Sequence, residues 1–162
     1  MNARRIGLIA AVAVAVFALD RITKAAVVAS IPLYETREVI GQYLRLSHVR
    51  NSGAAFGLAQ DRTTLLSILS IFAVLAILYY YRTIAMRSPW LAATLGMQLG
   101  GAFGNLVDRL GQGYVVDFVD VGIPDGPRFW SFNVADSSIV VGIFAVTLLV
   151  WLSERQQRPA PA

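Results

Sequence analysis

The side chains best suited to chemistry lie between residues 99 and 136, a polar stretch that joins two long apolar runs. Carboxylates, amides and an arginine this close to runs of lipid-spanning length are unfavourable unless they are paired or serve a function. The set comprises Asn105, Asp108, Arg109, Asp117, Asp120, Asn133 and Asp136. These residues are therefore the first candidates for a functional site.

Two aspartates brought close together can perform acid–base chemistry without any other group. Because two adjacent carboxylates do not both ionise readily, one stays protonated while the other remains a base. Such a pair can take a proton from water and donate one to a peptide carbonyl, which is aspartic protease chemistry. Spacing alone does not select the pair, since five aspartates lie near the ends of apolar runs: Asp20, Asp108, Asp117, Asp120 and Asp136.

The composition argues against most other chemistries. The chain has no cysteine, which excludes a thiol nucleophile and thiolate metal sites. His48 is the only histidine, and a lone histidine in a strand-like stretch is more often structural than catalytic. We therefore expect no metal and no other cofactor. The net charge of +4 comes without a basic cluster interleaved with aromatics, so we expect no nucleic-acid partner.

Four apolar segments must position these side chains. Charged residues make up 15% of the 162-residue chain, against about 25% in an average soluble domain. Because about 20 residues cross the hydrocarbon core of a bilayer, we expect transmembrane helices near residues 6–29, 63–81, 90–107 and 136–152. The expected fold class is a mainly α membrane protein with four transmembrane helices. Residues 1–162 then form one integral membrane domain that ends in a polar tail at 155–162.

Polar residues at the ends of two apolar segments have alternative interpretations. Asp20 and Lys24 lie four residues apart on one helix face, where they can pair with each other. They either snorkel to the membrane interface or support a site from below. Asp136 falls at the start of the last segment, where a carboxylate can also serve as a helix cap.

A stripe of small residues in the third segment predicts close helix packing. Gly96, Gly100 and Gly104 form two overlapping GxxxG units, which in lipid allow neighbouring helices to approach closely. The structural interpretation of this stripe is favoured over a catalytic one. Gly101 lies off the stripe, one turn before Asn105.

Two stretches outside the apolar segments alternate in the manner of strands. Residues 39–50 place His48 on one side and Ser47 and Val49 on the other. Residues 114–120 place Asp117 on the side of Val115 and Val119, so that Asp120 faces away from it.

Five segments of the chain together resemble lipoprotein signal peptidase, also called signal peptidase II. They are Asp20–Lys24, Asn51–Phe56, Gly100–Arg109, Val115–Phe118 and Phe132–Asp136. Each segment alone is a weak signal, but all five occur in order between four apolar runs. The resemblance covers nearly the whole chain and departs from the family pattern at no motif position.

The resemblance implies an aspartic endopeptidase of bacterial membranes. Such enzymes remove signal peptides from prolipoproteins by cutting just before a cysteine that carries diacylglycerol. The family's catalytic pair falls on Asp117 and Asp136. Supporting and substrate-binding roles fall on Asp20, Lys24, Asn51, Gly101, Asn105, Arg109, Asn133 and Ala135. Asp108 and Asp120 are then decoys, the first paired locally and the second turned away.

The resemblance also implies a location. The family lies in the bacterial cytoplasmic (inner) membrane, with both termini in the cytoplasm and the active site at the outer, periplasmic leaflet. Counting lysines and arginines on either side does not decide this orientation. The expected partners are diacylglyceryl-modified prolipoproteins and membrane lipid, and the expected state is a monomer. A small extracytoplasmic sheet, built from about residues 40–56, is expected to cradle the substrate.

Two other functions stay open from the residues alone. A small transporter or channel would use Asp20, Lys24, Asp117 and Asp136 as a proton relay that connects both sides of the membrane. A non-enzymatic scaffold would use the glycine stripe for assembly and leaves the polar residues unexplained.

Overall fold

The computed structural model describes residues 3–53, 62–84 and 88–156, and the structural account is confined to them. Within these ranges the elements are α1 (Ala3–Ser30), β1 (Thr36–Ile40), β2 (Leu44–Asn51), α2 (Thr63–Ile84), α3 (Pro89–Gln112), β3 (Val115–Val121) and α4 (Val134–Gln156). The expected mainly helical fold with a small sheet is confirmed.

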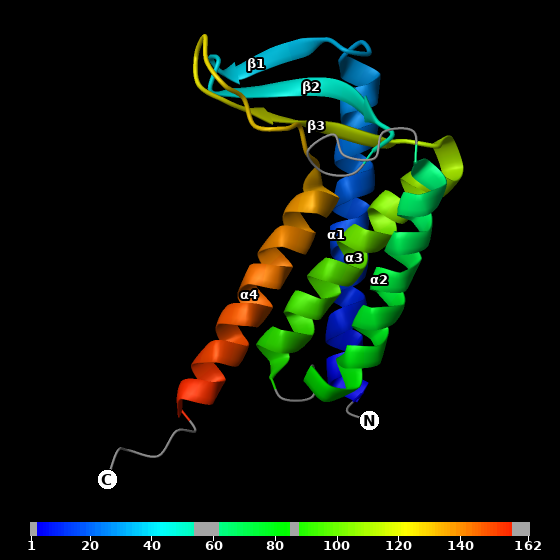
Figure 1. The fold of residues 1–162 in the computed structure, drawn as a ribbon, viewed down its shortest axis with the longest axis vertical. Helices are drawn as coiled ribbons and strands as arrows, with labels where there is room; N and C mark the ends of the chain where they lie inside the picture. Colours follow the sequence, from blue (N-terminus) through cyan, green and yellow to red (C-terminus); the bar gives the residue numbers. More distant parts are fainter. Residues whose placement is uncertain (1–2, 54–61, 85–87, 157–162) are drawn as a thin grey trace.

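The four helices form a bundle with the sheet at one end (Figure 1). Helix α3 is the central element, because it packs against α1, α2 and α4. Helix α1 begins and α4 ends at the end of the bundle opposite the sheet (Figure 1). The C-terminal parts of α1 and α3, which carry buried polar residues, therefore lie on the side of the sheet.

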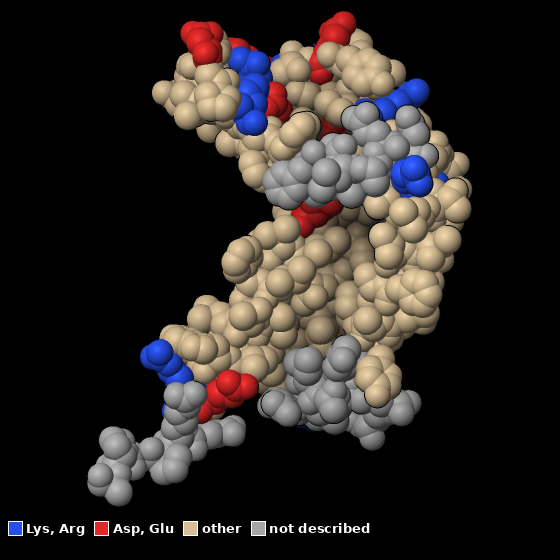
Figure 2. Space-filling view, in the orientation of Figure 1, with Lys and Arg blue, Asp and Glu red and all other residues tan. Residues whose placement is uncertain are grey.

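The outer helices carry apolar side chains on their exposed faces. Helices α1 and α4 are long and apolar enough to cross a membrane, and α2 contains a shorter apolar stretch, Thr63–Tyr79. Phe144 of α4 is 73% exposed, and Val14 of α1 is also largely exposed. Charged atoms lie mainly at the two ends of the face seen in Figure 2, with a broad uncharged zone between them. This surface suits lipid better than water.

Helix α3 has the opposite character, because its polar residues are buried. Gln98, Asn105 and Asp108 are each at most 9% exposed. The helix also continues to Gln112, five residues beyond the expected end of the third segment at 107. It ends at Gly113, whose φ of 80° is left-handed and whose N–H donates to the carbonyl of Arg109 at 3.1 Å. Hydropathy ends this segment early because Asp108 and Arg109 are polar, yet both find partners inside the protein.

The glycine stripe brings α3 against the backbone of α1. A Cβ atom at Gly96 would lie 2.8 Å from the carbonyl oxygen of Ile9, and one at Gly100 would lie 2.5 Å from that of Ala13. Gly101 faces α4 instead, where a Cβ atom would lie 2.5 Å from the carbonyl oxygen of Ala135. The structural interpretation of the stripe is therefore confirmed, and Gly101 serves a second helix contact.

The sheet is antiparallel, in the order β1-β2-β3. Thr36 of β1 pairs with Ser47 of β2, and Val49 of β2 pairs with Asp117 of β3. The register between β2 and β3 shifts between Leu46 and Val49. After β3 the chain turns back, and isolated bridges pair Phe132 with Val119 and Arg128 with Gly122. Residues 128–132 therefore run along the outer edge of β3.

A small apolar cluster fixes the sheet to α1. Phe118 of β3 packs with Val27 and Ile31 at the end of α1. His48 is buried, and its Nδ1 lies 2.9 Å from the carbonyl oxygen of Ile31. The single histidine thus has the structural role expected for it. Residues 54–56, the end of one sequence motif, lie outside the described residues.

Candidate active site

Asp117 and Asp136 reach one cavity from different elements. Asp117 lies in the middle of β3, and Asp136 lies in the first turn of α4. Both line a cavity of about 490 Å³ beneath the sheet. In the space-filling view a recess with acidic atoms separates the sheet from the helical bundle (Figure 2). The two residues that the resemblance selects are thus brought together.

Asn133 joins the two aspartates through its backbone and its side chain. Its Oδ1 accepts the backbone N–H of Asp136 at 2.9 Å, and its own N–H donates to Asp136 Oδ2 at 3.2 Å. This reciprocal arrangement is a capping box at the start of α4. The Nδ2 of the same residue donates to Asp117 Oδ1 at 2.7 Å. The residue that caps α4 therefore also holds the carboxylate on β3.

Neutral amides supply the remaining hydrogen bonds to the aspartate pair. Asn51 Nδ2 donates to Asp117 Oδ2 at 2.7 Å, and Asn105 Nδ2 donates to Asp136 Oδ1 at 2.7 Å. An asparagine amide is neutral, so it orients a carboxylate without placing a positive charge beside it.

Burial makes Asp117 a proton carrier near neutral pH. It raises the pKa of this carboxyl from 3.8 to about 7, and the neighbouring Asp136 acts in the same direction. The hydrogen bonds from Asn51 and Asn133 oppose the shift in pKa. One proton is therefore retained on Asp117 at pH values where an exposed aspartate is ionised.

Lys24 orients the amide that holds Asp136. Its ammonium donates to Asn105 Oδ1 at 3.0 Å. Because the oxygen of Asn105 is occupied in this way, its nitrogen is directed toward Asp136. Asn133 Nδ2 also lies 3.3 Å from Asn105 Oδ1. Lys24 therefore acts on the aspartate pair through one intervening side chain.

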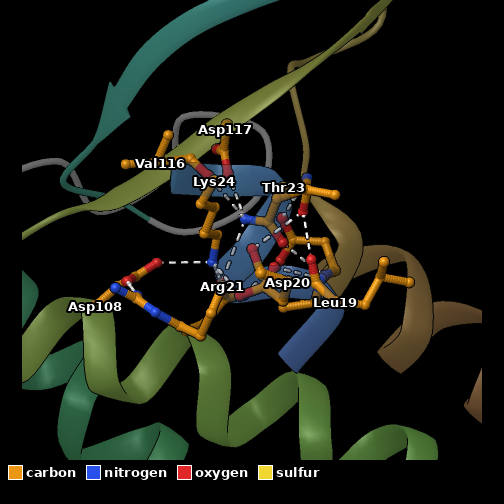
Figure 3. A network of polar contacts seen from close by, with 12 residues as sticks. Leu19, Asp20, Arg21, Thr23, Lys24, Asp108, Val116 and Asp117 are labelled. Atoms are coloured by element: carbon orange, nitrogen blue, oxygen red, sulfur yellow. Dashed lines mark hydrogen bonds and ion pairs between the residues drawn. The ribbon is translucent and has the colours of Figure 1, made fainter. Parts of the chain in front are cut away.

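Three buried charged residues form an ion cluster beside the pair, defined as Asp20, Lys24 and Asp108. Lys24 Nζ lies 2.7 Å from Asp20 Oδ2 and 2.7 Å from Asp108 Oδ2 (Figure 3). All three residues are at most 2% exposed. Arg21 forms a further ion pair with Asp108 from a half-exposed position. The cluster therefore ties α1 to α3 just below the aspartate pair.

The ion cluster also reaches α4. Asp20 Oδ1 accepts the backbone N–H of Ala135 at 3.0 Å. Ala135 is fully buried, and Gly101 leaves room for its carbonyl group. These contacts fix the first turn of α4, and with it the position of Asp136.

Arg109 faces the cavity with unused donor capacity. Its Nη2 donates to the carbonyl of Gly53 at 3.2 Å, whereas its buried Nε has no hydrogen-bond partner among the described residues. A buried donor without a partner is unfavourable unless a ligand uses it. This guanidinium is thus a candidate contact for a substrate oxygen.

Most of the cavity wall is apolar, and most of its apolar residues lie outside the five segments that carry the family resemblance. The wall includes Phe129, Trp130, Phe132, Ile139, Val140 and Val141. The last three lie on α4 within a continuous apolar run, so nothing in the sequence separates them from lipid-facing neighbours. Val115 and Phe132 were the detectable exceptions, because each belongs to one of those segments.

The two aspartates expected to be decoys, Asp108 and Asp120, are held by cations away from the cavity. Asp108 belongs to the ion cluster and pairs across helices rather than locally along the chain. Asp120 Oδ1 accepts Arg128 Nε at 2.7 Å. Neither residue lines the cavity that holds Asp117 and Asp136.

The bundle with its apolar faces, together with two amide-held aspartates in one cavity, defines a membrane enzyme. Two solved bacterial membrane enzymes, both studied by the in meso method, have the same fold. The first, at 2.3 Å resolution, has a TM-score of 0.87 at 29% identity and covers 97% of this chain and 95% of its own. The second, at 1.9 Å, has a TM-score of 0.80 at 32% identity, with coverages of 90% and 93%.

The family is that of signal peptidase (SPase) II, whose model matches residues 12–152. The lipoprotein signal peptidase of Moorella thermoacetica is 39% identical over 140 residues, which cover 86% of this chain and 87% of the relative. That of Syntrophomonas wolfei is 42% identical over 145 residues, with coverages of 88% and 92%. The chain belongs to the signal peptidase II family and is a membrane peptidase. Nothing in these relationships supports a transporter.

Proposed function

We propose that Asp117 and Asp136 are the catalytic pair of an aspartic endopeptidase that removes signal peptides from diacylglyceryl-modified prolipoproteins. The cut falls just before the lipidated cysteine. One observation carries the assignment of the pair: Asn133 contacts both carboxylates, so that two aspartates from separate elements share one cavity. The names of the relatives support the substrate class.

The pair supplies both the acid and the base that peptide hydrolysis needs. The ionised carboxylate of the pair takes a proton from water, whose oxygen attacks the carbonyl carbon of the scissile bond. The protonated carboxyl, which we assign to Asp117, donates its proton to the carbonyl oxygen. When the tetrahedral intermediate collapses, one of its hydroxyls returns a proton to the ionised carboxylate, the C–N bond breaks, and the departing amine takes up the proton of the other carboxyl.

The cavity suits a substrate that stays in the membrane. The apolar residues of α4, Ile139, Val140 and Val141, form a wall for the signal helix or the acyl chains. Arg109 lines this cavity, where its guanidinium can donate to a peptide or ester carbonyl oxygen of the substrate. Lys24, Asn105 and Asn51 position the carboxylates and take no direct part in the proton transfers.

We further propose four membrane-spanning helices and one integral domain over residues 1–162. The sheet and the aspartate pair lie at the outer leaflet of the bacterial inner membrane, and both termini are cytoplasmic. The shared end of α1 and α4, opposite the sheet, supports this arrangement (Figure 1). The protein acts as a monomer in contact with lipid, since one chain contributes both aspartates.

Cleavage of a lipidated substrate by purified protein tests the proposal. A diacylglyceryl-modified prolipoprotein and its unlipidated form are incubated with wild type and with Asp136→Asn in detergent, and the products are separated on a gel. We expect wild type to shorten only the lipidated form and the variant to shorten neither.

Two results would contradict the proposal. Turnover retained by a folded Asp136→Asn variant would remove this residue from the chemistry. Failure of a folded wild type to cut the lipidated form would reject the substrate class.

A further inference from the structure

A second cavity of about 390 Å³ lies next to the active-site cavity. Its own lining comes from Tyr34, Thr36, Ser47, Val49, Asp120 and Arg128. We call it the sheet cavity, because all but Tyr34 and Arg128 belong to the three strands. Residues 129–131 line both cavities and thus form a wall between them.

The two cavities adjoin along β2. On β2, Asn51 lines the active-site cavity, and Val49 and Ser47, at intervals of two residues, line the sheet cavity. Asn51 and Val49, two residues apart, share a face of β2, and Ser47 lies in the irregularity between Leu46 and Val49. Val49 also pairs with Asp117, so the sheet cavity begins one strand spacing, roughly 5 Å, from that aspartate. An extended chain of two to three residues, at about 3.3 Å each, covers this separation.

The sheet cavity offers polar groups with unused hydrogen-bond capacity. The hydroxyls of Thr36 and Ser47 lie 2.9 Å apart, and Ser47 Oγ donates to Asp120 Oδ2 over a long 3.5 Å. A hydroxyl accepts two hydrogen bonds and a carboxylate oxygen accepts at least two, so this row can still accept several N–H donors. The active-site cavity, in contrast, is walled mainly by apolar side chains.

The charges in the sheet cavity cancel. Arg128 Nε donates to Asp120 Oδ1 at 2.7 Å, and its Nη1 donates to the carbonyl of Gln42 at 2.8 Å. Gly122 allows the guanidinium to lie flat on the strand, since a Cβ atom there would be 2.8 Å from Arg128 Nη1. A neutral polar groove with spare acceptors suits main-chain amides better than a charged headgroup.

We propose that the sheet cavity binds the extended, hydrophilic segment of the substrate that follows the scissile bond. This inference rests on the proposed function, because it assigns the two cavities to the two sides of one cleaved chain. The apolar cavity takes the signal helix and lipid, and the sheet cavity takes the first residues of the mature polypeptide. The contacts reach the main chain, so the site tolerates many mature sequences.

Substrate length combined with a cavity-filling variant tests the inference. Thr36→Trp places a large side chain in the sheet cavity from an exposed strand position. It is assayed with a lipidated prolipoprotein and with a lipidated peptide that ends one residue after the modified cysteine. We expect KM for the long substrate to rise about tenfold with kcat retained, and both constants for the short peptide to stay unchanged.

Arg37→Trp is the matched control. Arg37 is also exposed on β1 but does not line the sheet cavity, so the same bulk on this strand should leave both substrates unaffected. An equal effect of Thr36→Trp on long and short substrates would overturn the inference, as would no effect on the long one. Failure of wild type to cut either substrate would reject the proposed function instead.

Photocrosslinking keeps the inference testable with the unaltered chain. Substrates carry a photoreactive residue at the second, third or fourth position after the modified cysteine. Adducts on Thr36, Ser47 or Tyr34 are expected, since these residues line the sheet cavity. Adducts confined to residues outside this cavity, or occupation of the cavity by a photoreactive lipid instead, would overturn the inference.

Discussion

Two neighbouring groups of carboxylates in this protein have opposite surroundings. In the ion cluster, the ammonium of Lys24 contacts both Asp20 and Asp108 at 2.7 Å. In the aspartate pair, Asp117 and Asp136 receive their short contacts from asparagine amides. Both groups are buried, and a single residue, Asn105, contacts both.

The difference separates carboxylates that serve a structural role from carboxylates that suit the proposed proton transfers. A cation held against a buried carboxylate favours its ionised form and makes the pair a rigid link between helices. Amide donors hold a carboxylate in place and leave a proton free to move between two carboxyl groups. Aspartate thus serves two purposes in this protein. Those that contact the ammonium of Lys24 link helices, and those that accept hydrogen bonds from asparagine amides form the pair in the cavity.

The largest effect is expected from Asp117→Asn, which changes the reactive group without changing its shape. We expect cleavage of a lipidated prolipoprotein to fall about a thousandfold or more, because the pair loses its titratable acid. The melting temperature in detergent should not fall. A comparable loss of cleavage in a folded Asp108→Asn variant would remove the distinction between the two groups.

A large loss of stability is expected from Lys24→Met, which leaves Asp20 and Asp108 buried without their shared cation. Breaking a buried ion pair in this way lowers the free energy of unfolding by about 3–5 kcal/mol. Arg21→Met is the matched control, because its side chain is 44% exposed and a pair of this kind contributes at most about 1 kcal/mol. Thermal unfolding of both variants in one detergent measures the contrast, and equal losses would contradict it.

A moderate loss of activity is expected from Gly101→Ala, which disturbs the link between the two groups. The added Cβ atom would lie 2.5 Å from the Ala135 carbonyl and would displace the first turn of α4. A displacement of this size should lower kcat about ten- to a hundredfold. Gly111→Ala, a position with nothing within 4 Å, should leave cleavage unchanged. Equal activity of the two variants would show that the position of α4 is not limiting.

The smallest effect is a pH-dependent difference in stability. Because folding raises the pKa of Asp117 from 3.8 to about 7, ionisation of this group opposes folding. The opposing contribution is absent below pH 3.8, grows as the pH rises toward about 7 and is complete above that value. The melting temperature of Asp117→Asn relative to wild type should therefore increase by at least about 2–4 °C between mildly acidic and mildly alkaline pH. A constant difference would contradict the raised pKa of Asp117.

The helices were largely predictable, because long apolar runs determine them. Their ends were less so: α3 passes Asp108 and Arg109, whose partners come from distant segments and are invisible to hydropathy. Strand β3 was found from its alternation, whereas all five residues of β1 are exposed and leave no pattern. Because no side chain of β1 is buried, no alternation of apolar and polar residues marks it, and only its pairing with β2 defines it as a strand.

The site residues were predictable only as a motif set. Spacing showed that Asp20 and Lys24 share a helix face, and the ion pair between them is present. That Asn133 contacts both aspartates depends on α4 beginning next to β3, which no local pattern encodes. The cavity wall on α4 was hidden because its residues have the same types as those that face lipid.

The double contact of Asn133 has a consequence for biosynthesis. Asp117 emerges from the ribosome before Asn133 and Asp136, and both later residues arrive with the last helix. Until that helix docks, Asp117 lacks the amide of Asn133 and Asp136 lacks the amide of Asn105. A partly synthesised chain therefore holds no assembled carboxyl pair, and the pair forms only when the last helix docks.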